Sequence, residues 1–315
     1  MDRRIGERQR WAWLAAGLSA VIAACLCGIS WLWVLIGGVL ATAYYIYMDI
    51  RLSAGRIRLP KGLGALTLLW TVFAMAWAAN LADRAFPMVN GFPVLGWTLL
   101  GLAAWGSRKG AAACARCAGV LCLFLVGLYG VVGVFAAPDV RWENLQVTGD
   151  WTDAILILGL FLLPASVWYV PCTASRKRPA WEMALILPLS AAALAAITAG
   201  VLTPTLASVH PAALYTLAQS VSLFGVVERI EPLLSAAMIL GVFCLLAAMA
   251  CACQHLGDRI RPCKWTGTAA CVAAAVFMGP AGKTDPVILA AGAIVFWLLI
   301  PPLMLVWDKK RDHRM

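Results

Sequence analysis

The chain has 315 residues, of which 63% are hydrophobic and only 13% are charged. Soluble proteins carry about 25% charged residues, so this composition excludes a soluble domain of any size. The net charge of +10 would suggest a nucleic-acid partner in a soluble protein. Here the position of the basic residues along the chain gives them another role, described below, and we expect no nucleic-acid binding.

Long apolar windows without charge recur along the whole chain. A helix needs about 20 apolar residues to cross the hydrocarbon core of a bilayer. Most windows therefore hold one span, and the first holds two, separated at Gly28, Ile29 and Ser30. The sequence predicts an all-α polytopic membrane protein with ten transmembrane helices in a single domain, residues 1–315. The predicted spans are 11–28, 31–49, 63–83, 92–106, 112–137, 153–173, 181–203, 230–255, 265–281 and 286–307.

The lysines and arginines lie almost entirely in alternate loops. With both termini in the cytoplasm, 21 of the 25 fall on the inner side, and only Arg84, Arg141, Arg229 and Lys283 on the outer side. Positive-inside orientation requires this asymmetry, which also offers a contact surface to anionic lipid of the bilayer. We expect a multi-pass protein of the inner (cytoplasmic) membrane.

Aromatic side chains cluster toward the inner end of span two. Tyr44, Tyr45 and Tyr47 precede Asp49 there, at the depth where membrane proteins carry interfacial aromatic residues. We therefore expect belt positions for these residues and no functional role.

The window 183–227 is long enough for two spans. A second crossing would invert every later loop and place Arg259, Arg261 and Lys264 outside, against the charge rule. We therefore predict one span followed by an outer segment at about 205–226. This segment is either a short helix across the outer mouth or a plain amphipathic loop.

Ten spans divide into two sets of five, about 11–137 and about 153–307, which enter the membrane from opposite sides. Inverted-repeat transporters have this arrangement, with discontinuous helices near the midplane. In span six, Gly159 and Pro164 predict a break over 159–166, because proline removes an intrahelical hydrogen bond. A simple kink is the alternative. Span one has no proline and no close glycine pair at mid-depth, so a continuous helix is favoured there.

The deep parts of the spans carry almost no ionisable residue. This disfavours a proton-coupled pump, whereas sodium binding by carbonyl and hydroxyl oxygens stays open. We expect no cofactor and no metal site. The three histidines, His210, His255 and His313, lie at or beyond span ends, so an intramembrane enzyme is not expected either.

One segment has a recognisable pattern. The stretch 215–246, YTLAQSVSLFGVVERIEPLLSAAMILGVFCLL, carries Phe224, Glu228, Arg229 and Glu231 ahead of an apolar helix. It resembles the spore-germination permeases, the B-type subunits of endospore germinant receptors within the amino acid–polyamine–organocation superfamily. The chain is shorter than members of that family, and Gln146 stands near the place of an expected proline, so the resemblance is to a shortened and diverged member.

The resemblance implies a ligand site enclosed by spans one, three, six and eight. Counting residues from the ends of these spans places the residues named below near the midplane of the membrane. Hydroxyls and the backbone at the break would hold the charged ends of an amino acid, and apolar side chains would hold its side chain. The residues expected in this site are Ser19, Ala23, Thr71, Phe73, Gly159, Phe161, Pro164, Met238 and Gly241.

Two carboxylates mark the outer start of span eight. Glu228 and Glu231 are three residues apart and share a helix face, while Arg229 points elsewhere. A capped helix start is one interpretation, since carboxylates are favoured at a helix N-terminus. A gate, or a contact for an extracytoplasmic partner, is the other.

The resemblance implies a membrane subunit that binds a small nutrient, such as an amino acid, and helps to trigger germination. Its partners would be the A-type membrane subunit and the C-type lipoprotein of the receptor, and its location the spore inner membrane. A freestanding amino-acid permease of the same superfamily is the alternative.

Overall fold

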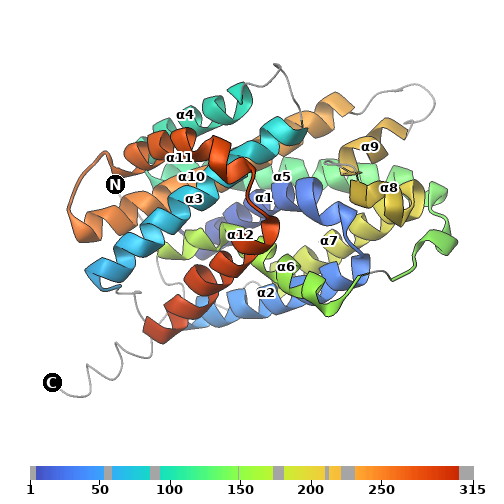
Figure 1. Cartoon of the computed structure of the whole chain (residues 1–315), viewed down its shortest axis with the longest axis horizontal. Coiled ribbons are helices and arrows are strands. Elements are labelled where there is room, and N and C mark those ends of the chain that lie inside the picture. The colour runs from blue at the N-terminus through green and yellow to red at the C-terminus, as the bar shows by residue number, and fades with distance from the viewer. Residues whose placement is uncertain are drawn as a thin grey trace.

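The computed structural model describes residues 5–52, 59–85, 93–147, 149–172, 181–209, 213–220 and 231–304. Within these ranges the chain is helical, apart from loops and an isolated bridge between Ile5 and Cys172. Most of the long helices run roughly along the long axis of the molecule (Figure 1). The α-helices are α1 (Glu7–Cys25), α2 (Trp31–Leu52), α3 (Lys61–Ala85), α4 (Val94–Lys109), α5 (Ala111–Ala136), α6 (Trp151–Phe161), α7 (Trp181–Leu202), α8 (Pro204–Val209), α9 (Ala213–Ser220), α10 (Glu231–Ile260), α11 (Thr266–Gly282) and α12 (Pro286–Ala293).

Shorter helical turns extend three of these helices. A 3-10 turn, η1 (Leu26–Gly28), follows α1, and a longer one, η4 (Leu163–Tyr169), follows α6. A π-helical turn, η5 (Ile294–Leu299), continues α12. Two further 3-10 turns, η2 (Ala137–Asp139) and η3 (Trp142–Asn144), lie between α5 and α6.

The chain is a multi-pass membrane protein by the length and composition of its helices. Seven described helices are long and apolar enough to cross a membrane, and the bent pair α6 and η4 makes an eighth. Helices α4 and α11 lie at two of the predicted spans but have only 16 and 17 residues. At about 1.5 Å per residue they fall short of the hydrocarbon thickness of about 30 Å.

Burial separates the central helices from the lipid-facing ones. In α1, 78% of the apolar window is buried, against 28% in α5 and in the last span. The side chain of Leu123 in α5 is 78% exposed. An exposed apolar surface of this kind is unfavourable in water and favourable against lipid, so the bundle is an all-helical membrane fold with α1 near its centre.

Small residues allow α1 and α10 to approach closely. A Cβ atom on Gly241 of α10 would lie 2.8 Å from Ser19 Oγ and 3.1 Å from Ala20 Cβ of α1. A Cβ atom on Gly17 would lie 3.4 Å from Leu245 Cα. Close backbone approach of this type drives helix association in membranes, where the hydrophobic effect between helices is weak.

Helix contacts join the first five predicted spans to the last five. Helix α3 packs on α4 and α11, and α10 packs on α11 and α4. Helix α1 packs on α5, α6 packs on α12, and α2 and α7 pack on each other. Helix α1 also packs extensively on α10, a contact that has no comparable counterpart between α6 and α3 in the described part of the chain.

The described part of the window 183–227 contains one long helix, as predicted. Helix α7 ends at Leu202, and Thr203 turns the chain with a positive φ of 73°. Helices α8 and α9, with 6 and 8 residues, are too short for a second crossing. Figure 1 shows both short helices beside the end of α7. The segment thus forms short helices where the sequence left a helix or a loop open.

Candidate functional site

The sixth span is broken, as the sequence predicts. Helix α6 ends at Phe161, and η4 continues from Leu163 at an angle of 41°. Pro164 lies in the first turn of η4, where its missing N–H is least costly. The first span differs, because α1 is continuous from Glu7 to Cys25. The break at 159–166 thus has no counterpart within α1.

Three tyrosine hydroxyls bond to backbone carbonyls at irregular turns. Tyr45 of α2 donates to the carbonyl of Phe161, the last residue before the bend. Tyr169 donates to the carbonyl of Phe296 at 2.9 Å, and Tyr44 donates to that of Trp297. Both of these carbonyls belong to the π-helical turn. In a membrane each buried carbonyl needs a partner inside the protein, so these tyrosines stabilise the two interruptions.

Tyr45 therefore does not occupy the belt position predicted for it, whereas the expectation that these tyrosines have no functional role stays a prediction. Tyr45 is fully buried, whereas Tyr47 is 38% exposed, as an interfacial residue would be. Counting residues from the span ends places all three at similar heights and does not show which face of α2 each occupies. The pair of adjacent tyrosines in an otherwise apolar helix was the sequence feature that could have predicted these buried hydrogen bonds.

Several of the predicted ligand residues meet where α1, α10 and η4 cross. Ser19 contacts Gly241, as described above, and a Cβ atom on Gly17 would lie 3.4 Å from Pro164 Cβ. Ala23 and Met238 are buried as well. The Ser19 hydroxyl donates to the Ala16 carbonyl of its own helix at 2.7 Å. These residues pack against one another in the present conformation.

The other predicted ligand residues have different neighbours. Thr71 is buried and donates to the Thr67 carbonyl at 2.7 Å. Phe73 lies beside Trp70, with ring centroids 5.6 Å apart, and Trp70 stacks on Phe296 at 5.5 Å. These contacts join α3 to the π-helical turn after α12.

Gly159 and Phe161 face other helices again. A Cβ atom on Gly159 would lie 2.4 Å from Ala290 Cα of α12, and the Phe161 ring lies 3.0 Å from the Cβ position of Gly38 in α2. The predicted residues with described neighbours thus divide among four contacts: α1 with α10 and η4, α3 with η5, α6 with α12, and Phe161 with α2.

A buried ion pair lies at one end of the bundle, and the sequence analysis missed it. Arg10 of α1 and Asp49 of α2 are joined at 3.2 Å, and each side chain is only 7% exposed. The indole N–H of Trp11 donates to the same carboxylate at 3.4 Å. The Arg10 guanidinium also lies 4.6 Å from the ring centroid of Trp168 in η4. We call this group the Arg10 latch: Arg10, Trp11, Asp49 and Trp168.

The chain just before α1 is fastened beside the Arg10 latch. The Ile5 N–H donates to the Pro171 carbonyl at 3.3 Å, and the Cys172 thiol donates to the Ile5 carbonyl at 2.8 Å. The start of the first span is therefore held to the end of the broken sixth span.

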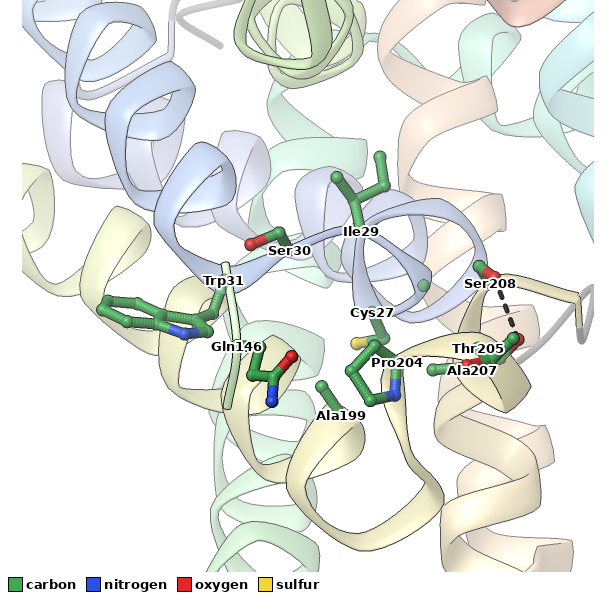
Figure 2. Close-up of a pocket in the computed structure, with 11 residues that line it drawn as sticks. Cys27, Ile29, Ser30, Trp31, Gln146, Ala199, Pro204, Thr205, Ala207 and Ser208 are labelled. Atoms are coloured by element: carbon green, nitrogen blue, oxygen red, sulfur yellow. Dashed lines mark hydrogen bonds between the residues drawn. The ribbon is translucent and has the colours of Figure 1, made fainter. Parts of the chain in front are cut away.

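The opposite end of the bundle contains an open pocket of about 260 Å³. It lies between η1, the start of α2, the loop before α6, the end of α7, and α8 (Figure 2). Its lining includes Cys27, so we call this the Cys27 end. The Arg10 latch and this pocket thus lie at opposite ends of the bundle.

The predicted gate or partner contact of Glu228, Arg229 and Glu231 lies almost entirely outside the described residues. Glu228 and Arg229 lie outside the described residues, and Glu231 begins α10 without a described side chain.

Comparison with known proteins shows no relationship for this chain. No family model matches the sequence, and no curated protein matches it significantly.

Proposed function

We propose that this chain is a solute-binding membrane protein with the inverted-repeat transporter fold, and that it acts as a nutrient-sensing subunit of a spore germinant receptor. The observation that carries the solute-binding proposal is the broken sixth span. A half-helix end at mid-depth offers backbone groups and a dipole to the ends of a small polar ligand. Tyr45 supports the break from α2.

Part of the neighbour pattern supports two repeats of five spans. The contacts that exchange between the halves, such as α1 with α5 and α6 with α12, are those an internal symmetry would produce. The basic residues support an orientation with both termini in the cytoplasm. Described basic helix ends lie together, as where Arg108 of α4 covers the Trp265 ring at 4.1 Å before α11.

The latch and the pocket support a protein that alternates between two states. The Arg10 latch joins spans one, two and six at one end, while the pocket opens at the Cys27 end. Opening the latch would expose the buried contacts of Ser19 and Gly241 from that side. The ligand, an amino acid, would then occupy the space between α1, α10 and the break.

Sensing and transport share this geometry. The germinant-receptor proposal rests on the ERIE segment, which lies mostly outside the described residues, and it implies A-type and C-type partner subunits in the spore inner membrane. The alternative is a freestanding amino-acid permease. The scarcity of ionisable residues at mid-depth favours the sensor, because an ion-driven pump needs a coupling site.

Uptake by sealed liposomes separates the two functions. The purified full chain is reconstituted, and radiolabelled L-alanine and L-leucine are followed over time with and without a sodium or proton gradient. A sensor retains label near one per protein, independent of the internal volume. Label that grows with internal volume and collapses with the gradient identifies a permease, and label equal to that of protein-free liposomes contradicts both.

A further inference from the structure

The pocket at the Cys27 end is built by fixed contacts between its walls. A Cβ atom on Gly28 would lie 2.8 Å from the Ala207 carbonyl oxygen, so η1 and α8 meet where only glycine fits. The Asn144 amide donates to the Gly200 carbonyl at 3.0 Å, which ties the loop before α6 to α7. The Trp31 indole N–H donates to the Leu145 carbonyl at 3.4 Å. These contacts hold the pocket open between four parts of the chain.

The pocket lining is mostly apolar, includes four polar residues and carries no acidic or basic side chain. The polar residues are Ser30, Gln146, Thr205 and Ser208. Figure 2 shows Trp31 and Gln146 on one side of the pocket and Thr205 and Ser208 on the other. The Gln146 amide and the Thr205 hydroxyl can donate and accept hydrogen bonds, whereas the Ser208 hydroxyl already donates to the Thr205 carbonyl at 2.9 Å and is left as an acceptor. A solute in the pocket would therefore find partners of both kinds on opposite walls.

One hydroxyl in the lining is already withdrawn from water. Ser30 Oγ is buried and finds no hydrogen-bond partner among the described residues. Because water does not reach this atom, a solute in the pocket does not reach it either, and the Ser30 hydroxyl is left out of the expected ligand contacts.

Charge and size limit the ligand. An ion or a zwitterion would lose hydration in the pocket without gaining an opposite charge from the lining side chains. The volume of about 260 Å³ lies just below the range of about 300–1,000 Å³ typical of pockets for drug-sized molecules. The pocket thus suits a small neutral solute with several hydrogen-bonding groups and an apolar face for the Trp31 ring.

We propose that the pocket at the Cys27 end is a binding site for a small neutral polyhydroxylated solute, of the class of a monosaccharide. This site is separate from the midplane site proposed above and does not depend on it. Such a solute would touch η1, α2, α7 and α8 at once and hold them in the arrangement described here.

Equilibrium binding tests the proposal. The full chain in lipid nanodiscs is titrated with tritiated glucose and tritiated ribose, and unlabelled L-alanine serves as competitor. We expect saturable binding of at least one of the two sugars, near one per protein, that excess L-alanine does not displace. Absence of saturable binding of both sugars overturns the proposal, and so does full displacement by L-alanine.

Variants locate the bound sugar. Ala199→Leu places a larger side chain into the pocket from α7, and we expect it to weaken sugar binding at least tenfold. Ala193→Leu, also on α7 but at an exposed position, is the matched control and should bind as the parent does. Gln146→Leu keeps the side-chain size at an exposed position, so it preserves folding, and it should weaken binding at least threefold.

Different results would contradict the amino-acid site at the midplane and the sugar site in the pocket. Parental sugar binding in both Ala199→Leu and Gln146→Leu overturns the pocket site, whatever L-alanine does in liposomes. Loss of L-alanine retention in the liposome experiment leaves the sugar titration unaffected.

Discussion

At the residue scale, the Arg10 latch is the contact with the largest expected cost of disruption. Its ion pair is 7% exposed on both sides, and Trp11 and Trp168 surround it. Removing one member of a buried pair leaves the other charge without compensation, which typically costs about 3–5 kcal/mol. An exposed pair would contribute about 0–1 kcal/mol, so burial gives this pair its importance.

We therefore expect Asp49→Asn to lower the free energy of unfolding by about 3–5 kcal/mol. Thermal unfolding of the detergent-solubilised protein, followed by near-UV circular dichroism, measures the change. The double variant Arg10→Met with Asp49→Leu should recover most of the loss, because no charge is left unpaired. Arg51→Gln, at an exposed position of the same helix end, is the control. A loss in Asp49→Asn no larger than in this control would contradict the buried pair.

The tyrosines of α2 give a second residue-scale prediction. Tyr45→Phe leaves the buried Phe161 carbonyl without its donor, and we expect a loss of about 1–3 kcal/mol. Tyr47→Phe removes the same hydroxyl from a side chain that is 38% exposed, and should change stability by less than about 0.5 kcal/mol. Chemical denaturation of both variants makes the comparison. Equal effects would mean that the Tyr45 hydroxyl does not support the break.

At the scale of the element, helix contacts determine what the midplane can hold. Helices α1 and α10 touch through Ser19, Ala20 and Gly241, so the shared surface depends on small residues. The same helices carry four of the nine predicted ligand residues. In this conformation the α1–α10 contact occupies the place of a ligand.

A larger side chain in this contact should separate the two helices. Gly241→Val brings new atoms against Ser19 and Ala20, and we expect a loss of about 1–3 kcal/mol from overpacking. Gly279→Val on α11 is the matched control, because nothing lies within 4 Å of its Cβ position. Thermal melting of both variants in the same detergent gives the result. Equal melting temperatures would show that α1 and α10 do not meet at Gly241.

At the scale of the whole molecule, the distribution of charge determines the orientation in the membrane. The proposed topology places Cys263 on the cytoplasmic side and Ser208 on the outer side. Both residues are exposed, so a membrane-impermeant maleimide can reach them from the appropriate side.

We expect a single-cysteine variant with only Cys263 to react in sealed right-side-out vesicles only after permeabilisation. A cysteine-free variant carrying Ser208→Cys should react at once. Gel-shift after labelling measures both. The reverse pattern would place the basic loops outside, and equal labelling of both sites in sealed vesicles would place them on the same side.

The sequence by itself determined where the chain enters and leaves the helices of the bundle. The separation at Gly28 and the break near Pro164 follow from local rules, because a span needs a minimum apolar length and a proline lacks a donor. Each of these rules applies to one short stretch of sequence, which is why these two predictions are confirmed. The charge rule allowed one crossing in the window 183–227 and left a helix or a loop open after Leu202.

Only the tertiary structure decided which faces meet. Arg10 pairs with Asp49, which is 39 positions away in the sequence, and Tyr45 donates to the carbonyl of Phe161, which is 116 positions away. Helices that are apolar all round carry no pattern that marks the buried face. Counting residues from the span ends therefore predicts the same membrane depth for Ser19, Phe73 and Gly159. In the structure these three residues contact different neighbours. The latch and the pocket are products of that packing, since each draws its residues from helices far apart in the chain.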